Sequence, residues 1–125
     1  MQVLHLSLFE QVSVDQDRLS TLYAQLGETG AEEVVCRALE ELALRLAQCE
    51  TRYHEGAWPM LRKNARSLSA IAEQIGMTGL STVAQDVTRC IDQGDHIALA
   101  ATLSRLLRIG ERSLIAIWDN QHLPL

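Results

Sequence analysis

Several kinds of residue are scarce in this chain of 125 amino acids, and their scarcity excludes whole classes of protein. The three cysteines, Cys36, Cys49 and Cys90, form no C-x-x-C pair, so the sequence predicts free thiols rather than a disulfide framework or a zinc site. No apolar run approaches the roughly 20 residues that a membrane-spanning helix needs. The first residues lack the basic region and the cleavage site of a secretory signal. These absences favour a cytoplasmic protein without a membrane partner.

Motifs that carry catalytic or metal-binding chemistry are also missing. The sequence has no glycine-rich phosphate loop, no nucleophile elbow and no H-E-x-x-H pair. Glutamates at 32–33 and 40–41 share a predicted helix, but no E-x-x-H pair accompanies them as a di-metal bundle would require. We therefore predict no enzyme activity, no catalytic residue, no metal and no cofactor, and we interpret these glutamates as a solvated helix face.

Basic residues are fewer than acidic ones, 11 against 16, which gives a net charge of -5. This balance disfavours nucleic-acid binding, because such binding depends mainly on neutralising phosphates. Three of the basic residues, Arg62, Lys63 and Arg66, nevertheless fall between Gly56 and Ala72, a segment without an acidic residue. A cationic patch on an acidic protein is a candidate docking site for an anionic partner, and a merely solvated helix face is the alternative.

Apolar residues recur at helical spacing along most of the chain, and strand-like alternation is nowhere sustained. The sequence therefore predicts an all-α protein, an antiparallel up-down four-helix bundle with a short additional N-terminal helix that covers one end. We divide the chain into an N-terminal arm (1–14), the bundle (15–119) and a C-terminal tail (120–125). The expected helices cover approximately residues 15–26, 31–53, 59–75, 79–93 and 96–119.

Residues that favour helix ends set these limits. Asp15 or Asp17, Thr78 and Asp95 are expected to cap the N-termini of the first, fourth and fifth helices. Pro59 suits the first turn of the third helix, where its missing N–H is harmless. Glycines are expected to end the first four helices, at positions 27, 56, 76 and 94.

The third expected helix has two distinct faces. With about 100° per residue, its apolar residues fall within about 60° of Leu68 and define a buried stripe. Arg66, Ala70 and Lys63 lie near the opposite side of the same helical wheel. Arg66 is therefore expected to be exposed to solvent in the middle of this helix.

This helix resembles the third helix of histidine-containing phosphotransfer (Hpt) domains, whose pattern is approximately A-H-x-L-K-G-x-x-x-x-x-G. The chain reads A-R-S-L-S-A at residues 65–70 and I-G at residues 75–76. The turns at 55–58 and 93–95 and the apolar Leu80 fit the same family, so the resemblance covers about residues 15–119. Three positions depart from the pattern: Arg66 replaces the phospho-accepting histidine, Ser69 the usual lysine and Ala70 the usual glycine.

The resemblance implies a role in two-component signalling, with a response-regulator receiver domain or a histidine kinase as the partner. Arginine stays protonated and offers no lone pair, so Arg66 cannot accept a phosphoryl group as histidine does. The expected function is therefore that of a pseudo-phosphotransfer protein, which binds its partner without carrying phosphate. The expected partner-binding residues are Arg62, Lys63, Arg66, Ser69, Ala70 and Glu73.

Two other interpretations of the sequence stay open. The chain could be a helical interaction or oligomerisation module unrelated to phosphorelays, since small residues such as Ala98, Ala100 and Ala101 permit close helix packing. It could also be an active relay that uses another histidine, with His54 a better candidate than those at positions 5, 96 and 122. The sequence leaves the oligomeric state open.

Overall fold

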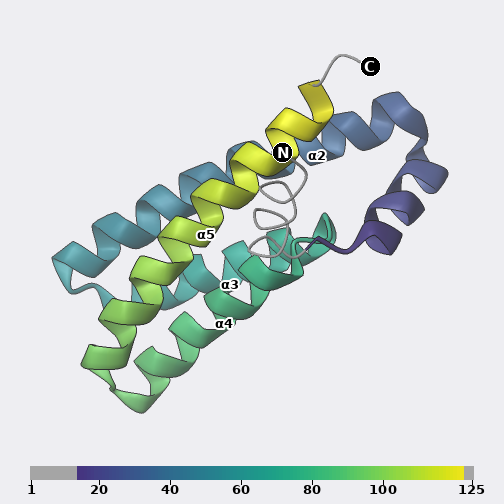
Figure 1. Ribbon diagram of the computed structural model, residues 1–125. Coiled ribbons are helices and arrows are strands. Elements are labelled where there is room, and N and C mark those ends of the chain that lie inside the picture. Colours follow the sequence, from purple (N-terminus) through teal and green to yellow (C-terminus); the bar gives the residue numbers. More distant parts are fainter. Residues whose placement is uncertain (1–13, 123–125) are drawn as a thin grey trace, which may run out of the picture.

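The computed structural model describes residues 14–122, with side chains as far as Ile117. Within this range the protein consists of four helices and has no strand (Figure 1). The prediction of an all-α protein is confirmed. The helices are α2 (Gln16–Glu55), α3 (Trp58–Gln74), α4 (Thr78–Gln93) and α5 (His96–His122).

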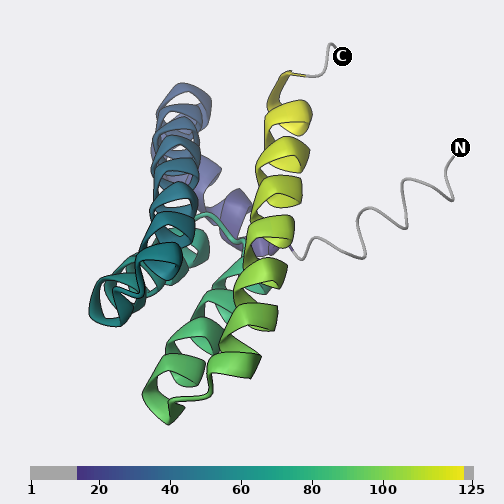
Figure 2. The same ribbon diagram turned by 90° about the vertical axis from the view of Figure 1, so that its left-hand side faces the viewer.

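Consecutive helices run in opposite directions and pack side by side, as Figures 1 and 2 show. The principal packed pairs are α2 with α3, α3 with α4, α4 with α5, and α5 with α2. This arrangement is the expected antiparallel up-down bundle. Its core is formed by one apolar stripe from each helix, including Leu42, Leu68, Val87 and Leu106, all at 0% exposure.

The first two predicted helices form the single element α2, which bends sharply at Gly27. The backbone of Gly27 is non-helical, with φ 74° and ψ 170°, so the glycine does end the first helical segment as predicted. That segment begins at Asp15, whose carboxylate Oδ1 accepts a hydrogen bond from the Arg18 N–H at 3.1 Å. Its Leu19 and Leu22 side chains pack against the core. The predicted short N-terminal helix therefore exists as the first turns of α2.

The N-terminal segment of α2 lies against the turn between α3 and α4 (Figure 1). Gly76, in this turn, makes the contact. The Asp15 N–H donates to the Gly76 carbonyl at 2.6 Å. Gly76 has a φ of 79°, and a Cβ added there would lie 2.7 Å from the Asp15 carbonyl oxygen. A glycine is thus needed both for the left-handed backbone and for the close approach of the two segments.

Two of the predicted helix ends need correction. Thr78 was expected to cap α4, but it is the first residue of this helix, and the capping position belongs to Met77, which offers no side-chain hydrogen bond. The Met77 side chain is fully buried, so packing rather than a polar cap fixes this end. α5 continues to His122, so residues 120–122 of the predicted tail are helical. The predicted arm lies almost entirely outside the described residues, as do residues 123–125.

The opposite end of the bundle is covered by aromatic side chains. Trp58 lies between Tyr53 and His96, with ring centroids 5.8 Å and 5.4 Å apart, respectively. Here the Asp95 cap is confirmed, because its Oδ1 accepts from the Ala98 N–H at 3.0 Å. The side chain of the other tryptophan, Trp118, lies outside the described part of the structure.

The part of the chain that the structure describes contains no helix with the length and apolar character needed to cross a membrane.

Candidate functional site

The candidate site lies on α3, whose two faces differ as the sequence predicts. Leu61, Ala65, Leu68 and Ala72 are completely buried against the neighbouring helices. The opposite face carries Lys63, Arg66 and Ala70, all exposed. Arg66 therefore projects from the middle of the helix into solvent, and the prediction of its exposure is confirmed. We call this surface, formed by Arg62, Lys63, Arg66, Ala70 and Glu73, the α3 face.

A depression of about 520 Å³ lies on the α3 face. It follows α3 from Pro59 to Ala70, with the Arg66 side chain part of its wall. Three of its six lining side chains are cationic, and the others are small or uncharged, so its lining attracts anions. The lining residues are Pro59, Arg62, Lys63, Arg66, Ser67 and Ala70.

Arg62 reaches across the α3 face to Asp92 in the last turn of α4. Its Nε donates to Asp92 Oδ1 at 2.7 Å and its Nη2 donates to Oδ2 at 3.0 Å. This two-pronged geometry is the one in which guanidinium and carboxylate groups bind most specifically. The ion pair therefore joins α3 to α4 at the edge of the candidate site.

The Arg62–Asp92 pair also changes the acidity of both groups. The hydrogen bond to Arg62 lowers the pKa of the Asp92 carboxyl, and the positive charges of Arg62 and Arg66 lower it further, while partial desolvation opposes them. The hydrogen bond to Asp92 raises the pKa of Arg62. Arg62 has the largest of these effects on Asp92 and Arg66 the smallest, so the carboxylate is coupled mainly to Arg62.

The cationic side chains of the α3 face differ in whether a neighbouring carboxylate neutralises them. Arg62 is neutralised by Asp92, whereas neither Lys63 nor Arg66 forms a hydrogen bond or ion pair with another described residue. Ala70, one turn after Arg66, leaves room for a partner to approach the helix. Glu73 is exposed in the next turn and adds a negative charge at the C-terminal side of the face. The unneutralised positive charge is therefore concentrated at Lys63 and Arg66.

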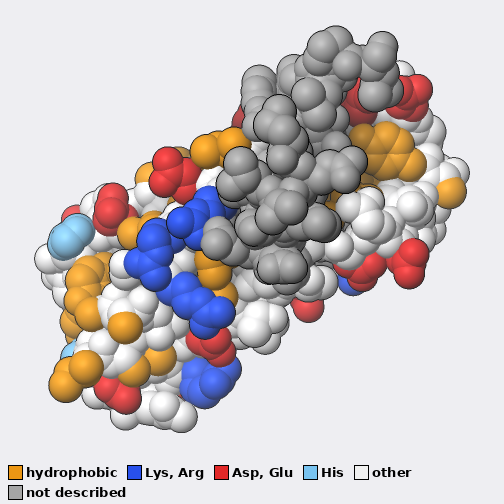
Figure 3. All heavy atoms as spheres, in the orientation of Figure 1, with side chains coloured by type: hydrophobic (Ala, Val, Ile, Leu, Met, Phe, Trp, Pro, Cys, Tyr) orange, Lys and Arg blue, Asp and Glu red, His pale blue; other side chains and the backbone are white. Residues whose placement is uncertain are grey.

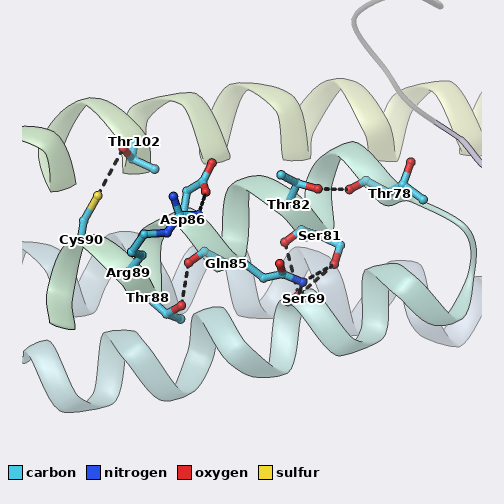
Figure 4. A network of polar contacts seen from close by, with 10 residues as sticks. All are labelled: Ser69, Thr78, Ser81, Thr82, Gln85, Asp86, Thr88, Arg89, Cys90 and Thr102. Carbon is cyan, nitrogen blue, oxygen red and sulfur yellow. Dashed lines mark hydrogen bonds and ion pairs between the residues drawn. The ribbon is translucent and has the colours of Figure 1, made fainter. Parts of the chain in front are cut away.

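Ser69 does not belong to the α3 face, contrary to the prediction that it contacts a partner. It is only 6% exposed and lies between α3 and α4. Its Oγ donates to the Ser81 carbonyl at 3.3 Å and lies 2.9 Å from Ser81 Oγ. The Gln85 side-chain amide donates to Ser69 Oγ at 3.2 Å, which completes a polar cluster between the two helices (Figure 4). The hydroxyl of Ser69 thus stabilises helix packing and is shielded from a docking protein.

The histidines lie away from the exposed middle of α3. His54 is exposed in the last turn of α2, where its ring meets that of Tyr53 edge to face at 5.6 Å. His96 begins α5 and packs against Trp58, with the two rings inclined at 42°. His5 and the side chain of His122 lie outside the described residues. Among residues 14–117, no group of three or more His, Cys, Asp or Glu side chains is arranged to hold a metal ion.

Sequence reasoning missed Asp92 as a member of this site. Asp92 lies 30 residues after Arg62, and nothing in the local sequence marks it as the partner of that residue. The only signal in the sequence is that Asp92 lies one residue before the predicted turn at 93–95. Because α3 and α4 run antiparallel from the turn near Gly76, the end of α4 lies beside the beginning of α3. That Arg62 and Asp92 lie side by side becomes clear only when the packing of the two helices is known.

Comparisons of the chain with protein-family models, with curated proteins and with solved structures gave no match.

Proposed function

We propose that this chain is an Hpt-like, pseudo-phosphotransfer protein of cytoplasmic two-component signalling. It binds a receiver domain or a histidine kinase through the α3 face and carries no phosphate. The observation on which the proposal rests is the position of Arg66, exposed in the middle of α3 and directly opposite the buried stripe. In the Hpt pattern that the sequence resembles, this is the position of the reactive histidine.

The chemistry of arginine supports binding in place of phosphotransfer. Its guanidinium has five N–H donors and no acceptor, so it holds carboxylates well but offers no nucleophilic nitrogen. The acidic pocket of a receiver domain is a suitable partner for such a group. Lys63 lies on the same face and adds a second positive charge, while Ala70 keeps the approach to Arg66 open. The expected effect of binding is to compete with an active phosphotransfer protein for the same receiver.

Isothermal titration calorimetry tests this proposal with receiver domains and histidine kinases encoded in the same genome. Wild type is compared with Arg66→Glu, which reverses the charge of the proposed anchor. The matched control is Arg108→Glu, which makes the same change at an exposed position in the middle of α5. We expect saturable binding that Arg66→Glu weakens at least tenfold and that Arg108→Glu retains. Equal binding by wild type and Arg66→Glu would exclude Arg66 as the anchor.

Incubation with a phosphorylated receiver separates this proposal from an active relay. We expect no acid-labile phosphate on the chain, because Arg66 cannot accept it. A labelled chain whose label disappears in His54→Gln would instead identify His54 as a phosphorylated residue and would contradict the proposed loss of phosphotransfer.

A further inference from the structure

Three hydrogen-bond donors without a partner line the depression on the α3 face. Lys63 and Arg66 form no hydrogen bond or ion pair with another described residue, and neither does the side chain of the half-buried Ser67. Pro59 and Ala70 complete the wall without adding a side-chain acceptor, and none of the described lining residues is acidic. The depression therefore offers an ammonium, a guanidinium and a hydroxyl group to a ligand.

These three donors leave the same side of α3. Arg66 and Ser67 follow Lys63 by three and four residues, spacings at which the Cβ atoms of a helix lie about 5–6 Å apart. Ala70 follows in the next turn, and its methyl group leaves the space beside them open. A single small anion in the depression can therefore contact all three donors.

The charge of the depression suits a dianion. Of its three cationic side chains, one is neutralised by the ion pair with Asp92, so two positive charges remain. Glu73 belongs to the α3 face but does not line the depression. A phosphoryl group carries about 1.5 to 2 negative charges at neutral pH and has three strong acceptor oxygens. It therefore satisfies both charges and all three donors, whereas a carboxylate has one charge and two oxygens.

Several basic side chains elsewhere on the bundle have acidic side chains beside them. Figure 3 shows a basic group over α5 and its border with α4, and acidic side chains lie next to this group. On α4, Arg89 forms an ion pair with Asp86, and on α2, Arg52 forms one with Glu55. The described lining of the depression on the α3 face differs from these surfaces, because it combines positive charges without an acidic residue.

We propose that the depression binds a phosphoryl group carried by the partner, so that the chain binds a receiver domain more tightly when an aspartate of the receiver is phosphorylated. This inference rests on the proposed function, because it takes the receiver as the partner. Lys63 and Arg66 hold the phosphoryl oxygens through charge-assisted hydrogen bonds, and the Ser67 hydroxyl donates a further one. The phosphoryl group stays bonded to the receiver, and no covalent bond forms or breaks.

Calorimetry with two forms of the same receiver domain tests this proposal. The receiver is titrated unmodified and again with beryllofluoride, a stable mimic of a phosphoryl group, bound to its aspartate. We expect the beryllofluoride form to bind at least tenfold more tightly. Equal affinity for the two forms would overturn this proposal and leave the proposed function standing. No binding of either form of any receiver would contradict both.

Two variants separate contact with the phosphoryl group from a change of shape in the receiver. Ser67→Ala keeps the charge of the site, so it should weaken binding of the beryllofluoride form several-fold and leave binding of the unmodified form nearly unchanged. Lys63→Gln, at an exposed position, should also reduce the preference for the beryllofluoride form. The matched controls, Ser20→Ala on α2 and Arg105→Gln on α5, change exposed residues elsewhere and should keep the wild-type preference. Retention of that preference by both α3 variants would overturn the proposal.

Inorganic phosphate, titrated without a receiver, distinguishes a phosphorylated protein from a small phosphate compound as the ligand. We expect phosphate alone to bind no more tightly than the millimolar range, because it makes no contact outside the depression. Saturation in the micromolar range would instead identify a small phosphate-bearing ligand and overturn the choice of a receiver.

Discussion

Arg62 and Asp92 form a bidentate ion pair that joins α3 to α4 beside the exposed Arg66. The carboxylate occupies the guanidinium donors that would otherwise face solvent, so Asp92 competes with any acidic partner for Arg62. It also brings a negative charge within the electrostatic influence of Arg66. Asp92 therefore limits the positive charge that the α3 face presents.

Replacing Asp92 by asparagine should strengthen binding of an acidic receiver domain several-fold. The substitution removes one negative charge from the site and releases Arg62 to contact the partner. The gain should shrink as salt rises, because the interaction is electrostatic and exposed. Calorimetry at two ionic strengths measures it, with Asp86→Asn, on the α5 side of the same helix, as the control. Weaker binding by Asp92→Asn would mean that Asp92 itself contacts the partner.

The Arg62–Asp92 pair should also depend on pH in a defined direction. The pKa of Asp92 is lowered from its ordinary value of 3.8, so the folded state favours the ionised carboxylate. The stabilisation is therefore present above the ordinary value and is lost as the pH falls through the lowered one. Carbon-detected NMR titration of the Asp92 carboxyl should give a midpoint below 3.8. In Arg62→Gln the midpoint should move up towards that value, and an unchanged midpoint would contradict the assigned cause.

Gly76→Ala should destabilise the protein more than Gly94→Ala. Both glycines have positive φ angles, so alanine at either position costs about 1–2 kcal/mol in backbone strain. At Gly76 the new Cβ also meets the Asp15 carbonyl oxygen, whereas at Gly94 nothing lies within 4 Å. Urea unfolding of the two variants measures the difference in the free energy of unfolding. Equal losses would show that the N-terminal segment of α2 does not depend on its contact with Gly76.

Cys49 should be the slowest of the three cysteines to react with a thiol reagent. Its side chain is fully buried, and burial raises the pKa of its thiol to about 11, although the charge of Arg45 opposes this shift. The reactive thiolate is therefore rare in the folded protein. Mass spectrometry after a timed pulse of iodoacetamide identifies the modified residues, and urea should make all three cysteines reactive. Rapid modification of Cys49 without denaturant would contradict its burial.

The helical spacing of the apolar residues was sufficient to predict the helices and the side of α3 that faces the core. A buried stripe on one side of a helix indicates the helix itself and the direction in which its other residues point. Leu68 and Ala72 mark the inner side of this helix, and Arg66 necessarily lies opposite them. The glycines at 27, 56, 76 and 94 ended helical segments as expected, because each has the positive φ that other residues avoid. The helices and the exposure of Arg66 thus depend on local rules that the sequence contains.

Features that depend on where a neighbouring helix packs could not be predicted from the spacing of apolar residues. Ser69 lies beside the buried stripe of α3, and only the position of α4 decides that its hydroxyl meets Ser81 instead of solvent. Asp92 becomes part of the site because the antiparallel packing of α4 brings it level with Arg62. Thr78 has a capping side chain, but the buried Met77 decides where α4 begins. Each outcome depends on tertiary contacts that local sequence does not encode.

NMR mapping of the surface that a receiver domain contacts shows whether Arg66 anchors the partner. The ¹⁵N-labelled chain is titrated with the unlabelled receiver that binds it, and the amide shift changes are assigned residue by residue. We expect changes centred on Lys63, Arg66 and Ala70, with little change at Arg105 and Arg108. Changes centred elsewhere on the bundle, with the α3 face unaffected, would contradict the claim that Arg66 anchors the partner.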